Sequence, residues 1–165
     1  KLYVKGIELK QNRLPPMMKE VMSFVIHGLL DGKAEYEMTG TLVGMLDSIM
    51  NQTVDVKSLC INARLQQNLD QYKVLGESRA GAAWANRVLG KGYRKGDSFL
   101  SIIDNNGSYI AFDDPKEIEG IAEIGYRHIA ERFIIAKVQP YYESVGYDMQ
   151  PLLNALNGVS GVNWL

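Results

Sequence analysis

Cysteine, histidine and long apolar runs are scarce in this sequence of 165 residues. Its single cysteine, Cys60, cannot form an internal disulfide, so we expect a reducing, cytoplasmic setting. One cysteine and two distant histidines, His27 and His128, do not supply the ligand spacing of a usual zinc site. The longest apolar runs, such as residues 133–138, are far too short to span a bilayer.

Net charge is also small, but it is unevenly distributed. The formal net charge is −1. Residues 1–20 hold five cations against two acids, a balance of +3, and residues 73–97 hold six cations against two acids, a balance of +4. Residues 104–123 hold six acids against one lysine, a balance of −5. This asymmetry favours a surface that faces a polyanion, and an ordinary patchwork of surface charge stays open as the alternative.

The hydrophobic pattern predicts an α+β fold that is mainly helical, with a short β-hairpin. Apolar residues make up 46% and charged residues 22% of the chain, which is typical of a globular protein. Asn-Gly at residues 106–107 supplies the positive φ of a hairpin turn. The expected helices are 15–30, 35–52, 80–89, 124–146 with an internal proline at 140, and 148–156; the expected strands are 2–9, 58–65, 99–104 and 108–112.

The segment "GKGYRKGD", residues 90–97, has the glycines and cations of a phosphate-binding loop but not its pattern. A P-loop requires Gly-Lys followed by Ser or Thr, between a strand and a helix. Here Asp97 follows the final glycine, and a predicted helix comes before a predicted strand. We therefore expect a capped turn that presents Lys91, Arg94 and Lys95, an arrangement suited to contact with a nucleic-acid backbone.

No group of residues has the pattern of a catalytic site. Cys60 lies in an apolar strand and is expected to be buried rather than nucleophilic. Asp113 and Asp114 could bind Mg²⁺, but beside a proline they favour a turn and a helix cap. Gly40 and Gly44 lie on one face of a predicted helix, where they would let another backbone approach closely.

Three stretches, in this order, resemble the C-terminal end of family B DNA polymerases. Residues 3–22, "YVKGIELKQNRLPPMMKEVM", are similar to the last palm strand and the first thumb helix. Residues 82–103, "AAWANRVLGKGYRKGDSFLSII", resemble the thumb segment in which a helix ends in a Lys-Gly turn before a strand. Residues 125–147 resemble the terminal thumb helix, including its inner proline. The Gln-Asn pair at 11–12 is closer to phage polymerases of the T-even type than to archaeal and eukaryotic members.

The resemblance implies a division of the chain and a task. Residues 1–14 would be the end of a palm-like strand, residues 15–156 a thumb-like domain and residues 157–165 a flexible tail. The task would be to grip the primer–template duplex during DNA replication, together with the palm, fingers and exonuclease of the same polymerase. The candidate DNA-binding residues are Lys73, Arg79, Arg87, Lys91, Arg94 and Lys95, followed by Lys10 and Arg13.

Several family elements are missing from this sequence. The catalytic aspartates, the exonuclease acids and the Lys-Lys-x-Tyr element lie upstream in the family. We therefore expect no catalytic residue here, no cofactor in this segment (Mg²⁺ belongs to the complete polymerase), and no polymerase activity from this chain alone. Many members carry a histidine at the start of the helix before the Lys-Gly turn, and in this sequence Gly81 stands at about that position. The tail resembles a sliding-clamp peptide, although Gly161 stands where an aliphatic residue is expected.

Two further expectations follow from these patterns. The chain begins inside a strand-like stretch without a methionine, which indicates a piece of a longer protein, in the host cytoplasm if it is viral. The alternative function is a non-catalytic protein-interaction module, which would dock through the Met-rich helix at 17–30 and the acidic face at 104–123. For the methionines of that helix, core packing is the preferred interpretation.

Overall fold

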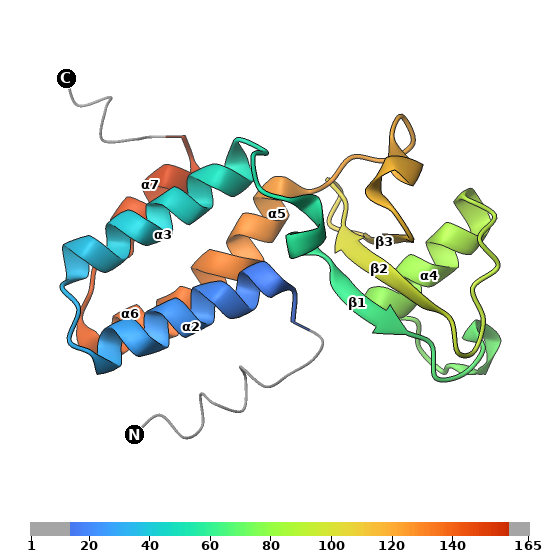
Figure 1. Ribbon diagram of the computed structural model, residues 1–165, viewed down its shortest axis with the longest axis horizontal. Coiled ribbons are helices and arrows are strands. Elements are labelled where there is room, and N and C mark those ends of the chain that lie inside the picture. The colour runs from blue at the N-terminus through green and yellow to red at the C-terminus, as the bar shows by residue number, and fades with distance from the viewer. Residues whose placement is uncertain (1–13, 159–165) are drawn as a thin grey trace. The chain divides into compact units, whose positions relative to one another are not determined.

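The computed structural model describes residues 14–158 (Figure 1). The chain divides into two compact units, of which one is Asp55–Gly125 and the other combines Lys1–Val54 with Tyr126–Leu165. We call them the sheet unit and the helical unit. The fold is α+β, as predicted. The thumb-like segment predicted at 15–156 contains parts of both units, while the strand predicted at 2–9 lies outside the described residues.

The helical unit is built from helices that alternate between two distant parts of the sequence (Figure 1). Helix α3 packs against α5 and α7, while α2 packs against α6 and the π-helical turn η4. Helices α2 and α3 were both predicted from hydrophobic periodicity, and for α2 also from the prolines at its first turn. The elements are α2 (Pro16–Leu30), α3 (Glu35–Met50), α5 (Tyr126–Ala130), η4 (Glu131–Ile135), α6 (Ala136–Val145) and α7 (Gln150–Leu156).

The core of the helical unit is apolar and includes the Met-rich helix. Met17, Met18 and Met22 of α2 are buried, as core packing requires. Leu42 and Leu46 of α3 are completely buried. Each such side chain stabilises the fold by roughly 1.5–3 kcal/mol through removal of apolar surface from water. The predicted helix at 124–146 is found as α5, η4 and α6, and a change of pitch at η4 was not predicted.

The sheet unit contains a three-stranded antiparallel sheet in the order β1-β2-β3 (Figure 1). The predicted hairpin is confirmed, with Leu100 opposite Phe112 in the register of β2 and β3. Its turn is closed by Asp104, whose Oδ1 accepts hydrogen bonds of 2.9 Å from the backbone N–H groups of Asn106 and Ser108. The elements are η1 (Val56–Leu59), β1 (Ile61–Arg64), η2 (Leu69–Gln71), α4 (Glu77–Val88), β2 (Ser98–Ile103), β3 (Tyr109–Phe112) and η3 (Pro115–Ile118).

Helix α4 packs across β2 and β3 and begins three residues before the predicted start at residue 80. Gly81 makes this packing possible, because a Cβ there would lie 2.8 Å from the carbonyl oxygen of Ile110 and 2.9 Å from Oγ of Ser101. Gly81 is therefore a packing residue. Among residues 14–158, no helix has the length and apolar character needed to cross a membrane.

Candidate nucleic-acid interface

The turn at residues 90–97 is held in one shape by the end of helix α4. Gly90, Gly92 and Gly96 adopt φ values of 67°, 68° and 92°, which glycine reaches without steric cost. Asn86 of α4 accepts a hydrogen bond of 2.6 Å from the N–H of Tyr93 and donates one of 3.0 Å to its carbonyl oxygen. The turn is therefore clamped to the helix by one amide side chain.

Within this turn, Asp97 closes the segment that contains Arg94 and Lys95. Its carboxylate accepts a hydrogen bond of 3.0 Å from the N–H of Arg94, and its own N–H donates one of 3.0 Å to the carbonyl oxygen of Arg94. The side chains of Arg94 and Lys95 are exposed. Asp97, which argues against a nucleotide-binding loop, has a structural role in presenting these cations.

A second loop, residues 65–73, is joined to this turn by backbone hydrogen bonds. The N–H of Leu65 donates to the carbonyl oxygen of Asp97 at 3.0 Å, and the N–H of Gly96 donates to that of Leu65 at 2.8 Å. Asn68 Oδ1 accepts a hydrogen bond of 2.8 Å from the N–H of Lys95. The two loops therefore form one surface at this end of the sheet unit.

Tyr72 organises the second loop and contacts one of the predicted cations, Arg79. Its hydroxyl oxygen accepts hydrogen bonds from the N–H groups of Gln66 and Gln67, at 3.1 and 3.3 Å. The guanidinium of Arg79 lies over its ring, 4.4 Å from the centroid, which is a cation–π contact. Lys73 follows Tyr72 directly and is exposed. Arg79 and Lys73 therefore lie beside the loop that contacts Lys95.

Lys91 differs from the other predicted cations because its charge is neutralised within the sheet unit. Its ammonium lies 2.7 Å from a carboxylate oxygen of Asp113 and 2.8 Å from one of Glu117, and its side chain is only 20% exposed. The hydrogen bonds with Asp113 and Glu117 raise the pKa of Lys91. The bond from Lys91 in turn lowers the pKa of Asp113. Lys91 therefore anchors the turn and is poorly placed to meet a phosphate.

The same cluster includes Tyr93, whose side chain points into the sheet unit. Its ring stacks on Phe99 at a centroid distance of 4.9 Å, and its hydroxyl donates a hydrogen bond of 2.8 Å to Asp113. Burial, followed by the bond to Asp113, raises the pKa of Tyr93. Burial alone would raise the pKa of Glu117, but the hydrogen bonds from Lys91 and from backbone N–H groups hold it below its ordinary value.

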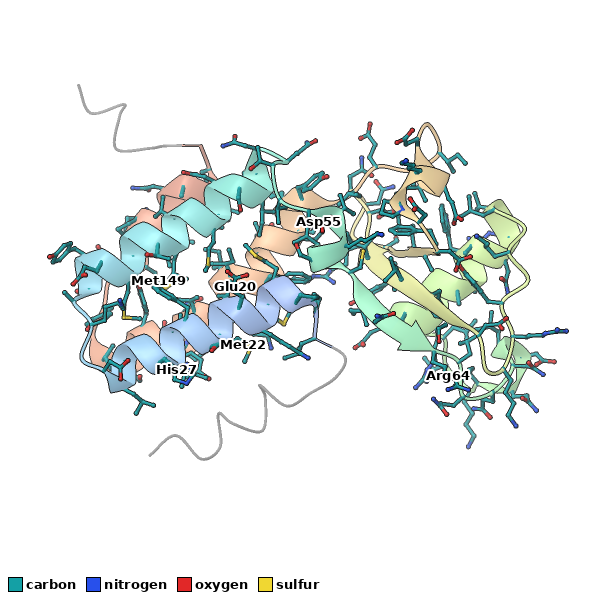
Figure 2. The ribbon with its side chains drawn as sticks, viewed as in Figure 1. Glu20, Met22, His27, Asp55, Arg64 and Met149 are labelled. Carbon is teal, nitrogen blue, oxygen red and sulfur yellow. The ribbon has the colours of Figure 1, made fainter. Side chains whose placement is uncertain are left out.

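One cation of this surface, Arg64, is absent from the predicted set. It ends β1 opposite Ser98 and is exposed, because exposed side chains alternate along this strand. Figure 2 shows Arg64 at the end of β1 among other nitrogen-tipped side chains. The alternation of the strand predicted at 58–65 could have indicated it. Because Arg64 precedes Leu65, it lies beside the joined loops.

The eight predicted cations thus fall into three groups. Arg94, Lys95, Lys73 and Arg79 lie on or beside the joined loops, and Arg87 is exposed near the end of α4. Lys91 is paired with acids. Lys10 and Arg13 lie outside the described residues. We define the cationic surface as Arg64, Lys73, Arg79, Arg94 and Lys95, none of which forms a salt bridge within residues 14–158.

Other candidate chemistry finds little support among the described residues. Cys60 is buried, and burial raises its pKa to about 12, so the thiol stays protonated near neutral pH. The expected burial of Cys60 is confirmed, although the residue lies between η1 and β1 and not within the predicted strand. Asp114 accepts a hydrogen bond from the N–H of Lys116 at the start of η3, which is the predicted cap. Residues 14–158 contain no group of three or more His, Cys, Asp or Glu side chains that could hold a metal ion.

No protein-family model matches the chain, and no curated protein matches it significantly.

Proposed function

We propose that this chain is the thumb region of a family B DNA polymerase, whose sheet unit binds the backbone phosphates of the primer–template duplex. The resemblance of three stretches in the family's order supports this proposal. The observation that carries it is the cationic surface: Lys73, Arg94 and Lys95 are exposed on two loops that hydrogen bonds join to each other, and Arg64 and Arg79 lie beside these loops at the ends of β1 and α4. Because these bonds hold the loop backbones in place, binding to a phosphate would cost little backbone freedom.

Binding of this kind is governed by charge and not by base sequence. Lys and Arg side chains that neutralise phosphates release counterions, so affinity falls as salt rises. Such contacts fix the position of a duplex without reading its bases. The thumb would therefore hold the product duplex in register while the catalytic carboxylates and Mg²⁺ of the complete polymerase perform phosphoryl transfer. Alone, this chain would bind duplex DNA weakly and extend no primer.

The alternative, a protein-interaction module, has lost one of the two surfaces on which it depended, the Met-rich helix. Met17, Met18 and Met22 of the Met-rich helix are buried in the core of the helical unit. Within the acidic face, Asp113 and Glu117 bind Lys91, and other acids cap turns or accept local hydrogen bonds. Lys91 therefore offsets part of the charge of the acidic face, which is the one surface that the alternative retains.

The test is fluorescence anisotropy of a labelled primer–template duplex titrated with the chain at several salt concentrations. Arg94→Ala/Lys95→Ala should lower the affinity for duplexes of unrelated sequence to a similar extent. It should also flatten the slope of log affinity against log salt by about 1.8, since each lost phosphate contact removes about 0.9. Lys91→Met should leave that slope unchanged.

The matched control is Lys116→Ala/Arg132→Ala, which also removes one lysine and one arginine from exposed positions. Its salt slope should equal that of the unchanged chain. Absence of binding at low salt, or equal slopes for the two double variants, would contradict the proposal. A slope that changes with Lys91→Met would restore Lys91 as a phosphate contact.

A further inference from the structure

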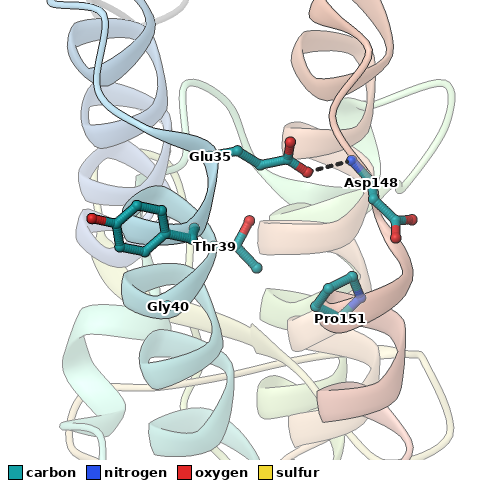
Figure 3. Close-up of a pocket in the computed structure, with 6 residues that line it drawn as sticks. Glu35, Thr39, Gly40, Asp148 and Pro151 are labelled. Atoms are coloured by element: carbon teal, nitrogen blue, oxygen red, sulfur yellow. Dashed lines mark hydrogen bonds between the residues drawn. The ribbon is translucent and has the colours of Figure 1, made fainter.

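The helical unit contains an open pocket that the proposed DNA-binding function does not use. It has a volume of about 600 Å³ and is lined by Glu35, Tyr36, Thr39, Gly40, Asp148 and Pro151. Figure 3 shows the Glu35 carboxylate of α3 reaching the backbone N–H of Asp148 in the segment before α7, with Thr39 and Gly40 on the same helix as Glu35. The pocket lies entirely within one unit.

The apolar part of the lining is combined with two carboxylates. Glu35 accepts a hydrogen bond of 2.9 Å from the N–H of Asp148, and the Asp148 carboxylate accepts one of 2.9 Å from the N–H of Gln150. These bonds fix the positions of both acids in the lining of the pocket. The exposed side chain of Tyr36, at 79%, and the exposed ring of Pro151 provide apolar surface next to them.

No cation of the described chain compensates these acids. Helices α3 and α7 contain no lysine or arginine. Within residues 14–158, neither Glu35 nor Asp148 forms a salt bridge. The nearest lysine in sequence, Lys33, lies over the ring of Phe24 on α2, 5.9 Å from its centroid. The pocket is therefore complementary in charge to a cation from another molecule.

We propose that this pocket binds an arginine or lysine side chain of a basic peptide segment in a partner protein. The aliphatic stem of such a side chain would cover the apolar lining, while its charged head would meet Glu35 and Asp148. The ring of Tyr36 would add a cation–π contact, which favours arginine. An enclosed small-molecule site fits less well, because Tyr36, Gly40 and Pro151 are all open to solvent.

Gly40 supports close approach of a partner backbone. A Cβ at Gly40 would have no neighbour within 4 Å, and its φ is not in the left-handed region, so the fold does not require glycine there. A glycine inside a helix costs roughly 1 kcal/mol relative to alanine. The missing side chain leaves the floor of the pocket open. A Cβ at Gly44, one turn later, would likewise have no neighbour within 4 Å. Because Gly44 is not part of the pocket lining, it provides a control.

The test is an NMR titration of the ¹⁵N-labelled chain with a blocked peptide in which two arginines alternate with alanine. Its partner probe has citrulline in place of each arginine, which preserves shape and removes charge. The arginine peptide should shift the amide signals of residues 35–40 and 148–152, and the citrulline peptide should bind about tenfold more weakly. Equal binding of the two peptides would overturn the proposal.

Two pairs of variants test whether the peptide binds in this pocket. They distinguish such binding from attraction to the negative charge of the chain in general and from loss of the fold. Gly40→Leu should weaken binding about tenfold, whereas Gly44→Leu should not. Glu35→Gln/Asp148→Asn should weaken it to a similar extent, while Glu37→Gln/Asp47→Asn, which removes two acids of α3 outside the lining, should not. Each variant is compared with the unchanged chain by its NMR spectrum. If both members of either pair behave alike, the peptide binds elsewhere or by net charge, and the proposal is wrong. The outcome is independent of DNA binding.

Discussion

Helix α4 of the sheet unit and helix α3 of the helical unit both contain glycine in their interior, for opposite reasons. At Gly81 of α4, a Cβ would lie 2.8 Å from the carbonyl oxygen of Ile110. At Gly40 of α3, a Cβ would meet nothing within 4 Å. The first glycine allows the helix to approach its own sheet, whereas the second leaves space on the outside of the molecule. A helix glycine can therefore be explained only after the space around it is known.

The two units also differ in how they hold their loops. In the sheet unit, side chains such as Asn68, Asn86 and Asp97 bind backbone groups of neighbouring loops and keep the cationic surface in shape. In the helical unit, packing is mainly apolar, with a buried hydrogen bond of 2.8 Å between the hydroxyls of Thr39 and Tyr142. Loops of the sheet unit should therefore respond strongly to loss of a single polar side chain.

The largest expected effect belongs to Gly81→Ala. The added methyl group must displace backbone of β3 or the Ser101 side chain, so we expect a loss of about 2 kcal/mol in the free energy of unfolding. Urea denaturation of the full chain, followed by circular dichroism, measures this loss. Gly40→Ala is the matched variant, and its free energy of unfolding should rise by about 0.5–1 kcal/mol. Equal changes in the two variants would remove the distinction between the two glycines.

Asn86→Ala should have the next largest effect, on the sheet unit alone. The variant leaves the backbone N–H and carbonyl groups of Tyr93 without the amide that binds both of them. We expect a loss of about 1.5 kcal/mol in the free energy of unfolding, together with faster hydrogen exchange at residues 91–97. Asn154→Ala, on α7 of the helical unit, is the comparison and should leave the exchange of this turn unchanged. If the turn stays protected in Asn86→Ala, the clamp is not what orders it.

Much of the fold follows from local sequence patterns. Helices α2, α3 and α7 and the hairpin were predicted because periodicity, prolines and Asn-Gly act over a few neighbouring residues. The start of α4 was missed, since residues 77–79 have no apolar periodicity and become helical with the rest of α4. The pitch change at η4 had no local signal either.

The candidate site was only partly accessible from sequence, because its details depend on long-range contacts. Lys91 and Arg94 look alike in the sequence, yet only Lys91 meets acids that lie 22 and 26 positions further along the chain. That pairing depends on how the segment after β3 lies against the turn, which no local pattern specifies. Arg64 was accessible in principle from the alternation of β1. The pocket at Glu35 and Asp148 joins positions 113 residues apart and was not accessible.

Lys91→Met should be the least destabilising of these three variants. The dependence of its free energy of unfolding on pH shows whether the lost ion pairs cause the change. The pKa of Lys91 is raised in the folded chain. Its charge therefore contributes to the free energy of unfolding below the ordinary lysine pKa of about 10.4, and this contribution is lost as the pH rises through the folded value. The pKa of Asp113 is lowered, so its contribution is present above about 3.9 and is lost as the pH falls through the folded value. The interaction is therefore complete between these limits.

The free energy of unfolding of Lys91→Met should be about 1 kcal/mol below that of the unchanged chain near neutral pH, because the charges are partly exposed. The difference should shrink as the pH falls below about 4, since Asp113 and Glu117 become protonated and no longer bind the lysine. Urea titrations across this range measure it, with Lys116→Met as the control for loss of an exposed lysine. A difference that stays constant with pH would show that Lys91 acts through the packing of its stem, and the turn would then be anchored in the same apolar way as the helical unit.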